Sequence, residues 1–207
     1  MSDESRDAAN RSARDQKKEA YLRAIYDRYT GRFRSDRQQE ASAQAQEVHA
    51  EMDDLLTRDL AKDAGSAGIR CGKGCSHCCH EPVEIWPQEA ELLIEVMHKT
   101  GRGLDRERLA RQSACTVENW RLQPQADRAC VFLGADGACT VYEFRPNVCR
   151  KLLVVTDPAL CDATYQQPDS VGRWFSWEAE LLESAALEVF GASLMPQALL
   201  AALNPKD

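Results

Sequence analysis

Residues 71–79 read C-G-K-G-C-S-H-C-C and hold four of the nine cysteines in the chain. These four are Cys71, Cys75, Cys78 and Cys79, and a second group follows, made of Cys130, Cys139, Cys149 and Cys161. Cys115 stands alone between the groups. Thiols at this density either pair as disulfides or bind a soft metal. We expect the two groups to meet in space around metal.

The cellular compartment of the protein influences whether its cysteines form disulfides or bind metal. Residues 1–12 are charged and lack the apolar region of a secretory signal. No apolar run approaches the roughly 18 residues that a membrane span requires. These features predict a cytoplasmic protein, in which thiols stay reduced. The odd number of cysteines also argues against a framework made only of disulfides.

The composition limits the other classes of function. The chain has 207 residues, 43% of them apolar, and a net charge of −7. This length suits one compact domain with an appendage. Nucleic acids and anionic membranes both require a basic face, so an acidic chain is a poor candidate to bind either.

The N-terminal third predicts a helical extension. We expect a disordered tail over residues 1–18 and a helical extension over residues 19–64. Its first helix has one apolar face and weakens at Gly31; the face is formed by Tyr21, Leu22, Ile25, Tyr26, Tyr29 and Phe33. Its second helix runs from about residue 37 to 63, with a stripe of Val48, Met52, Leu55, Leu56 and Leu60. Packing of these stripes within the chain is favoured, and contact with a protein partner is the alternative.

Residues 65–207 predict a cysteine-cluster domain with further helices. One helix starts at Pro87, with Glu89 near its positive end, and a second spans residues 105–121. The second helix carries Cys115, and its predicted inward residues are Leu109, Val117 and Trp120. A third helix spans about residues 176–190, and a last one residues 197–203. The third helix has a predicted core set of Trp177, Leu181, Leu182, Ala185 and Val189.

The strongest β signal lies within the second cysteine group. Residues 130–133 and 139–142 are β-prone, and the Gly134–Gly137 segment between them has turn chemistry. A hairpin here would bring Cys130 close to Cys139. The predicted fold is therefore mainly α with a small β-hairpin, in which helices pack around an irregular Cys-rich metal-binding core.

The cysteine spacing suits two kinds of metal centre. Cys71, Cys75 and Cys78 could supply three ligands to a tetrahedral zinc ion or to an iron–sulfur cubane. Adjacent side chains in an extended chain point apart, so Cys79 serves a second centre, bridges two metals or is free. The eight clustered cysteines suffice for two four-thiolate sites or for one polynuclear site, and the spacing does not decide which.

Other residues near the cysteines offer alternatives. His77 and His80 are alternative ligands, although soft metals prefer sulfur, and His49 and His98 are expected to be ordinary helix residues. Five basic residues adjoin cysteines in sequence: Arg70, Lys73, Arg145, Arg150 and Lys151. They would either lower the pKa of nearby thiols or act as solvated loop charges.

The two blocks together resemble the YkgJ family of cysteine-cluster proteins, also called the CxxCxxCC or zinc- or iron-chelating domain. The matching residues of the first block are Cys71, Gly74, Cys75, Cys78, Cys79, Val83 and Glu89. Those of the second block are Cys130, Phe132, Leu133, Gly137, Cys139, Val141, Tyr142, Arg145, Pro146, Cys149 and Arg150. The resemblance covers roughly residues 70–165, and the three-residue gap between Cys71 and Cys75 departs from the motif in the family's name.

The resemblance implies a metal-binding module without a defined reaction. We expect zinc or iron as the cofactor, with a [4Fe-4S] cluster as one form of the iron. The first hypothesis is a chelating or structural metal module, the second an iron–sulfur redox protein, and the third a metal-folded interaction scaffold. The sequence contains no nucleophile arrangement or nucleotide-binding fingerprint that would identify an enzyme.

Overall fold

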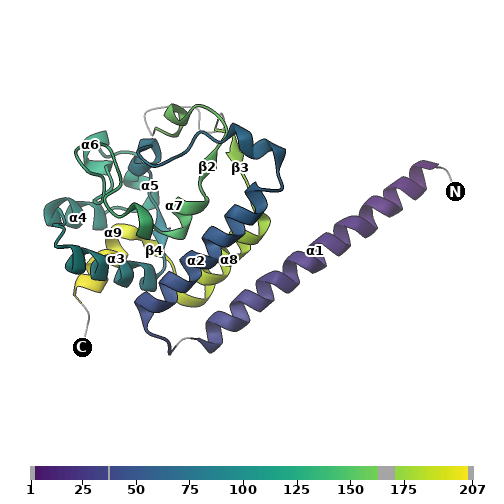
Figure 1. Cartoon of the computed structure of the whole chain (residues 1–207), viewed down its shortest axis with the longest axis horizontal. Helices are drawn as coiled ribbons and strands as arrows, with labels where there is room; N and C mark the ends of the chain where they lie inside the picture. Colours follow the sequence, from purple (N-terminus) through teal and green to yellow (C-terminus); the bar gives the residue numbers. More distant parts are fainter. Residues whose placement is uncertain (1–2, 37, 163–170, 205–207) are drawn as a thin grey trace.

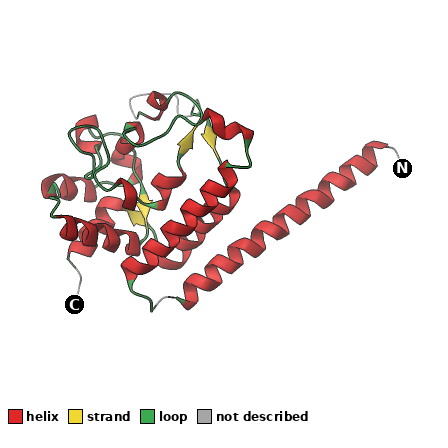
Figure 2. Ribbon diagram, viewed as in Figure 1, coloured by secondary structure: helices red, strands yellow, loops and turns green. Residues whose placement is uncertain are grey.

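A computed structural model describes residues 3–36, 38–162 and 171–204. The described residues are mainly helical, and their strands are two residues long, which confirms the predicted fold class (Figure 2). The α-helices are α1 (Asp3–Ser35), α2 (Ala41–Leu60), α3 (Pro87–Thr100), α4 (Arg106–Ser113), α5 (Val117–Trp120), α6 (Gln125–Arg128), α7 (Asn147–Lys151), α8 (Trp177–Phe190) and α9 (Met195–Leu203). Among the described residues, four 3₁₀ turns occupy Ala64–Gly68, His77–His80, Tyr142–Phe144 and Pro158–Cys161.

The N-terminal helices pack on the C-terminal helix α8. Figure 1 shows α2 and α8 side by side, with the N-terminal end of α1 extending away from the body. Ile25, Tyr29 and Phe33 of α1 are buried, and the Phe33 ring lies 5.3 Å from the ring of Phe190 in α8. Helix α2 buries Val48, Met52, Leu55 and Leu56, so both apolar stripes pack within the chain. This packing agrees with the favoured interpretation of the extension.

Helix α1 differs in length from the prediction. It begins at Asp3, so the tail expected over residues 1–18 is helical wherever it is described, and Gly31 does not interrupt it. A Cβ at Gly31 would meet no atom within 4 Å, which shows that this glycine is not required by packing. Tyr21, predicted on the apolar face, is 63% exposed. The buried face of α1 therefore begins only at Ile25.

Local end signals set the bounds of α3 and α8. Pro87 opens α3, and Gly101 follows its last residue in the left-handed region at φ +65°, a conformation that glycine adopts without strain. Ser176 caps α8 by accepting a hydrogen bond from the Ala179 amide. Both helices lie where the sequence predicted them.

The single helix predicted over residues 105–121 is wrong, because the chain forms α4 and α5 with a break between them. Thr116 starts α5 through a capping box with Asn119, and this second start signal outweighs the continuous periodicity. Cys115 consequently lies between the helices and is buried. Val117 is 50% exposed and not inward, whereas Leu109 and Trp120 are buried as predicted.

The strands pair segments that are far apart in the chain. Strand β1 (Glu84–Ile85) pairs antiparallel with β4 (Ser193–Leu194), and β2 (Leu153–Val154) with β3 (Arg173–Trp174). The hairpin expected at residues 130–142 has a minimal form, an isolated antiparallel bridge between Leu133 and Cys139. Gly137 completes its turn at φ +75°.

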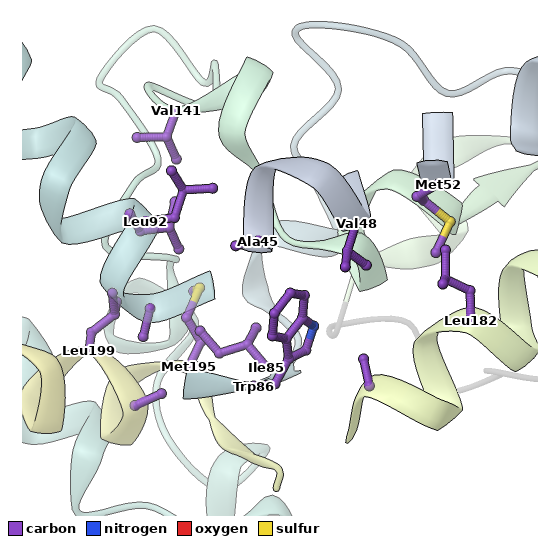
Figure 3. Packing of buried hydrophobic residues seen from close by; sticks show 14 of the residues in the cluster. Ala45, Val48, Met52, Ile85, Trp86, Leu92, Val141, Leu182, Met195 and Leu199 are labelled. Atoms are coloured by element: carbon purple, nitrogen blue, oxygen red, sulfur yellow. The ribbon is translucent and has the colours of Figure 1, made fainter. Parts of the chain in front are cut away.

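The core lies where α2, α3, α8 and α9 meet. Trp86, at the start of α3, is fully buried among side chains from these helices (Figure 3). Its ring lies 5.4 Å from that of Phe190 and 6.4 Å from that of His49. Trp177 lies outside this core: it is 52% exposed, contrary to the prediction, while Leu182, Ala185 and Val189 of the same helix are buried.

In the described parts of the chain, no helix combines the length and the apolar character needed to cross a membrane.

Candidate metal centre

The first cysteine group is a loop that the backbone ties to strand β2. The Arg70 amide donates to the Val154 carbonyl at 2.8 Å, and the Val154 amide donates to Cys71 Sγ at 3.2 Å. The loop then turns at Gly74, whose φ of +93° favours glycine. The 3₁₀ turn His77–His80 carries Cys78 and Cys79, and its end is fixed by Trp120 Nε1, which donates to the His80 carbonyl at 2.8 Å.

The second group begins directly against the first. The Cys130 amide donates to the Cys79 carbonyl at 2.8 Å, which joins the two groups through the backbone. The bridge between Leu133 and Cys139 then folds the chain back, so that Cys139 faces the same region as Cys130. Two segments some fifty residues apart in the sequence are thereby fixed side by side.

Cys149 and Cys161 come from two further short elements. Cys149 lies in α7, and Cys161 ends the 3₁₀ turn Pro158–Cys161, which packs on the turn that carries Cys78. Both cysteines are half-buried, as are the other six members of the two groups.

Cys78 is close enough to several of the clustered thiols to interact with them electrostatically. Its sulfur shares a hydrogen bond with Cys79 and interacts electrostatically with five other thiols, those of Cys71, Cys130, Cys139, Cys149 and Cys161. The remaining member, Cys75, interacts with Cys71 and Cys161. Cys115 is separate: its thiol donates to the carbonyl of Arg111 in α4. The chain thus gathers the eight predicted ligands in one neighbourhood and leaves the ninth cysteine elsewhere.

Burial is the main reason why the protonated form of five of these thiols is favoured. It raises the pKa of Cys130 to about 12 and that of Cys161 to about 11, and it also raises the pKa of Cys71, Cys139 and Cys149. The pKa of Cys78 is raised first by its hydrogen bond with Cys79 and then by burial. A metal that binds here must therefore displace protons from the sulfurs.

The basic residues beside the cysteines do not lower the pKa of these thiols overall. Burial raises the pKa of Cys139, and Arg145 lowers it as predicted, but the effect of burial is the larger. The other charges are used elsewhere: Lys73 pairs with Glu143, Lys151 pairs with Glu180, and Arg150 pairs with Asp53. Arg145 also stacks on the Tyr142 ring, 3.9 Å from its centroid.

The donor set suits a soft metal, although the donors do not converge on a single point. Across the described ranges, no three Cys, His, Asp or Glu side chains lie close enough together to hold a metal ion without some rearrangement. All nine cysteines are free thiols. His80 Nδ1 is buried without a hydrogen-bond partner, so a lone pair beside Cys79 is available. Eight sulfurs with this unpaired nitrogen match the ligands of zinc and of iron–sulfur centres.

Sequence reasoning missed a buried polar group behind the second cysteine group. Glu89, interpreted as a charge at a helix start, is fully buried, and its Oε1 lies 2.9 Å from Nε2 of the equally buried His49. Glu183 of α8 lies close to Glu89 and is also buried. Helical periodicity could have found these residues, because Glu89 is in phase with Leu93 and Val96, and His49 is in phase with Met52 and Leu56.

Comparison with known proteins gives one match. Residues 70–169 match the model of the CxxCxxCC family, whose description is "Putative zinc- or iron-chelating domain". No curated protein and no solved structure gives a significant match to the chain.

Proposed function

We propose that the chain, whose residues 70–169 match the CxxCxxCC family, binds zinc or iron through its eight clustered cysteines. The ligands of this proposal are Cys71, Cys75, Cys78, Cys79, Cys130, Cys139, Cys149 and Cys161. The observation that carries it is that four separate segments bring their thiols near one another: the Cys130 amide donates to the Cys79 carbonyl at 2.8 Å, the turns that carry Cys78 and Cys161 pack together, and Cys149 interacts electrostatically with Cys78 and Cys130. A hydrophobic core does not need half-buried thiols from four segments to lie near one another, whereas a thiolate metal centre does.

The metal would shape this region as well as occupy it. The segments that carry the thiols are a glycine turn, 3₁₀ turns, one isolated bridge and a five-residue helix. Short elements of this kind gain little stability from their own hydrogen bonds. A metal that draws the sulfurs together would stabilise the region by cross-linking it, as structural zinc does in small domains.

The iron–sulfur form is the finer version of the proposal. Eight thiols suffice for a [4Fe-4S] cluster with four cysteines to spare. In that form the protein would pass electrons to a partner, which redox-inert zinc does not do. A reducing compartment such as the cytoplasm, which is our proposal for its location, would keep the thiols available for either metal.

One experiment tests the proposal and separates its two forms. The full chain is purified without oxygen, its visible spectrum is recorded, and iron, zinc and acid-labile sulfide are measured per chain. A brown protein with iron and sulfide would support the cluster, and a colourless protein with stoichiometric zinc would support the zinc site. A wild-type protein with neither metal, and with all of its thiols free to react, would overturn the proposal.

We expect Cys75→Ser and Cys139→Ser each to lower the metal content and to destabilise the fold. Each substitution removes one proposed sulfur ligand, from the first and the second group respectively. Cys115→Ser is the matched control, because this buried cysteine lies apart from the cluster and hydrogen-bonds to Arg111. Metal content is measured per folded chain. Unchanged stoichiometry in both ligand variants would rule out the site as proposed.

A further inference from the structure

The turn that carries Cys149 is held by a side chain from another helix. Helix α7 has five residues, too few to be stable by itself, and it follows Pro146, which has no amide hydrogen. The first free amide of this turn, that of Asn147, donates to Oε1 of Glu89 at 2.7 Å. Asn147 and Glu89 are both fully buried, so this bond is protected from water.

Glu89 is in turn held by α2. Its Oε1 lies 2.9 Å from Nε2 of His49, and only 4% of His49 is exposed. The other ring nitrogen of His49 faces Nη2 of Arg150 at 3.5 Å. A guanidinium can only donate, so Nδ1 accepts and the ring proton sits on Nε2. His49 therefore donates to Glu89, and the same carboxyl oxygen accepts from both α2 and α7.

Arg150 fixes the far side of the same turn. Its Nη1 donates to Oδ2 of Asp53 in α2 at 2.6 Å, and its Nε donates to the Arg145 carbonyl at 2.8 Å. Its Nη2 also donates to the Glu143 carbonyl. Cys149 thus lies between two residues, Asn147 and Arg150, that are each tied to α2, directly or through Glu89.

Helix α2 lies outside residues 70–169, the segment that matches the family. We propose that His49 and Glu89 are positioning residues for Cys149, and that the N-terminal helix α2 is therefore a working part of the metal centre. The inference rests on the proposed function, because it takes Cys149 as a ligand. It goes beyond that function in assigning part of the ligand geometry to a helix outside the cysteine domain.

The test removes the hydrogen-bonding group and keeps the shape. Glu89→Leu leaves the Asn147 amide without its acceptor, and Glu89→Gln restores an acceptor oxygen. The zinc-loaded full chain is challenged with a chromogenic chelator, and the rate of zinc release is measured. Groups that hydrogen-bond to metal ligands typically contribute about 10-fold to 100-fold to the affinity for the metal. Glu89→Leu should therefore release zinc at least about 10-fold faster than the wild type. Glu89→Gln should release zinc at a rate close to that of the wild type. If Glu89→Leu does not fold, His49→Leu is tested in its place. This variant leaves the Glu89–Asn147 hydrogen bond intact, so it should increase the rate of zinc release by a smaller factor.

A double substitution distinguishes positioning from general loss of stability. If Glu89 acts through Cys149, then Glu89→Leu should accelerate zinc release in the wild-type background and have no further effect in Cys149→Ser. Equal acceleration in both backgrounds, or none in the wild type, would overturn the inference.

The metal-free chain gives a second readout, which separates this inference from the proposed function. Alkylation of each cysteine by iodoacetamide is followed by mass spectrometry. Glu89→Leu, or His49→Leu in its place, should accelerate alkylation of Cys149 and leave the rate at Cys139 unchanged. Equal acceleration at both thiols would again overturn the inference. Absence of zinc and iron from the wild-type protein would overturn the proposed function whatever the alkylation pattern.

Discussion

Replacing Trp86 by alanine is expected to lower the free energy of unfolding by about 3 to 5 kcal/mol, the usual cost of removing a large aromatic side chain from a packed core. Trp86 is fully buried, and it contacts the ring of Phe190 in α8 and the ring of His49 in α2 (Figure 3). Its backbone carbonyl also accepts a hydrogen bond from the Glu89 amide in the first turn of α3. The loss would therefore loosen the contact between the N-terminal and C-terminal helices.

Trp86→Phe is the matched control for this experiment. The indole nitrogen of Trp86 is buried without a hydrogen-bond partner, so phenylalanine removes an unsatisfied donor while it keeps most of the aromatic contact. We expect a clearly smaller loss of stability than in the alanine variant. Denaturant unfolding monitored by circular dichroism measures both variants in the same metal state. A loss below about 1 kcal/mol in Trp86→Ala, a value close to that of surface substitutions, would show that Trp86 does not anchor this core.

Replacing Glu183 by glutamine is expected to stabilise the protein at alkaline pH. Glu183 is 2% exposed, and neither of its carboxyl oxygens has a hydrogen-bond partner. Burial, and after it the neighbouring Glu89, raise the pKa of this carboxyl to about 8. The folded chain therefore keeps the proton at pH values where the unfolded chain has lost it.

The sign of the pH dependence follows from that difference. The protonated carboxyl makes its full contribution to stability below the pKa of an unfolded glutamate, about 4.3. This contribution to stability is lost progressively as the pH rises from about 4.3, the pKa of the unfolded chain, to about 8, the pKa of the folded chain. Each pKa unit corresponds to about 1.4 kcal/mol, so the rise from about 4.3 to about 8 favours Glu183→Gln over the wild type at pH 8 by on the order of 5 kcal/mol. Near pH 4 the two proteins should be equally stable.

Denaturant unfolding at pH 5, 6, 7 and 8 measures this difference. The control is Glu91→Gln, which removes an exposed carboxylate of α3 and should reproduce the wild-type profile. Thiol ionisation affects all three proteins alike and cancels in the comparison. Parallel profiles for Glu183→Gln and the wild type would mean that the Glu183 carboxyl is not buried in its protonated form.

Much of the helical framework could be predicted because its signals are local. Pro87 and Gly101 bound α3, Ser176 opens α8, and the stripe of Val48 and Met52 identifies the buried face of α2. Each signal acts within a few residues, through a cap or through the periodicity of one face. The cysteine spacing similarly identified the candidate ligands, because several thiols within nine residues cannot move far apart.

Prediction was wrong where two local signals competed. The periodicity of residues 105–121 favours one helix, but the capping box at Thr116 starts a second. Trp177 follows the capping residue Ser176 on the predicted core face, yet it is exposed and packs at 4.7 Å on Phe175. Periodicity assigns a side chain to a face of its helix, and the position of neighbouring elements decides how far along that face burial extends.

Local patterns in the chain were enough to establish the ends of α3 and α8, the predominance of helix and the two cysteine groups with their family resemblance. The short helices α6 and α7 were not predicted. Three features required the folded chain: the pairing of β1 with β4, the backbone hydrogen bond from Cys130 to Cys79 that joins the two cysteine groups, and the two hydrogen bonds that Glu89 accepts, from His49 and from Asn147. The physical reason is the range of the interactions. Caps and stripes depend on residues within one or two turns, whereas a buried carboxyl or a two-residue strand depends on donors that arrive from distant segments.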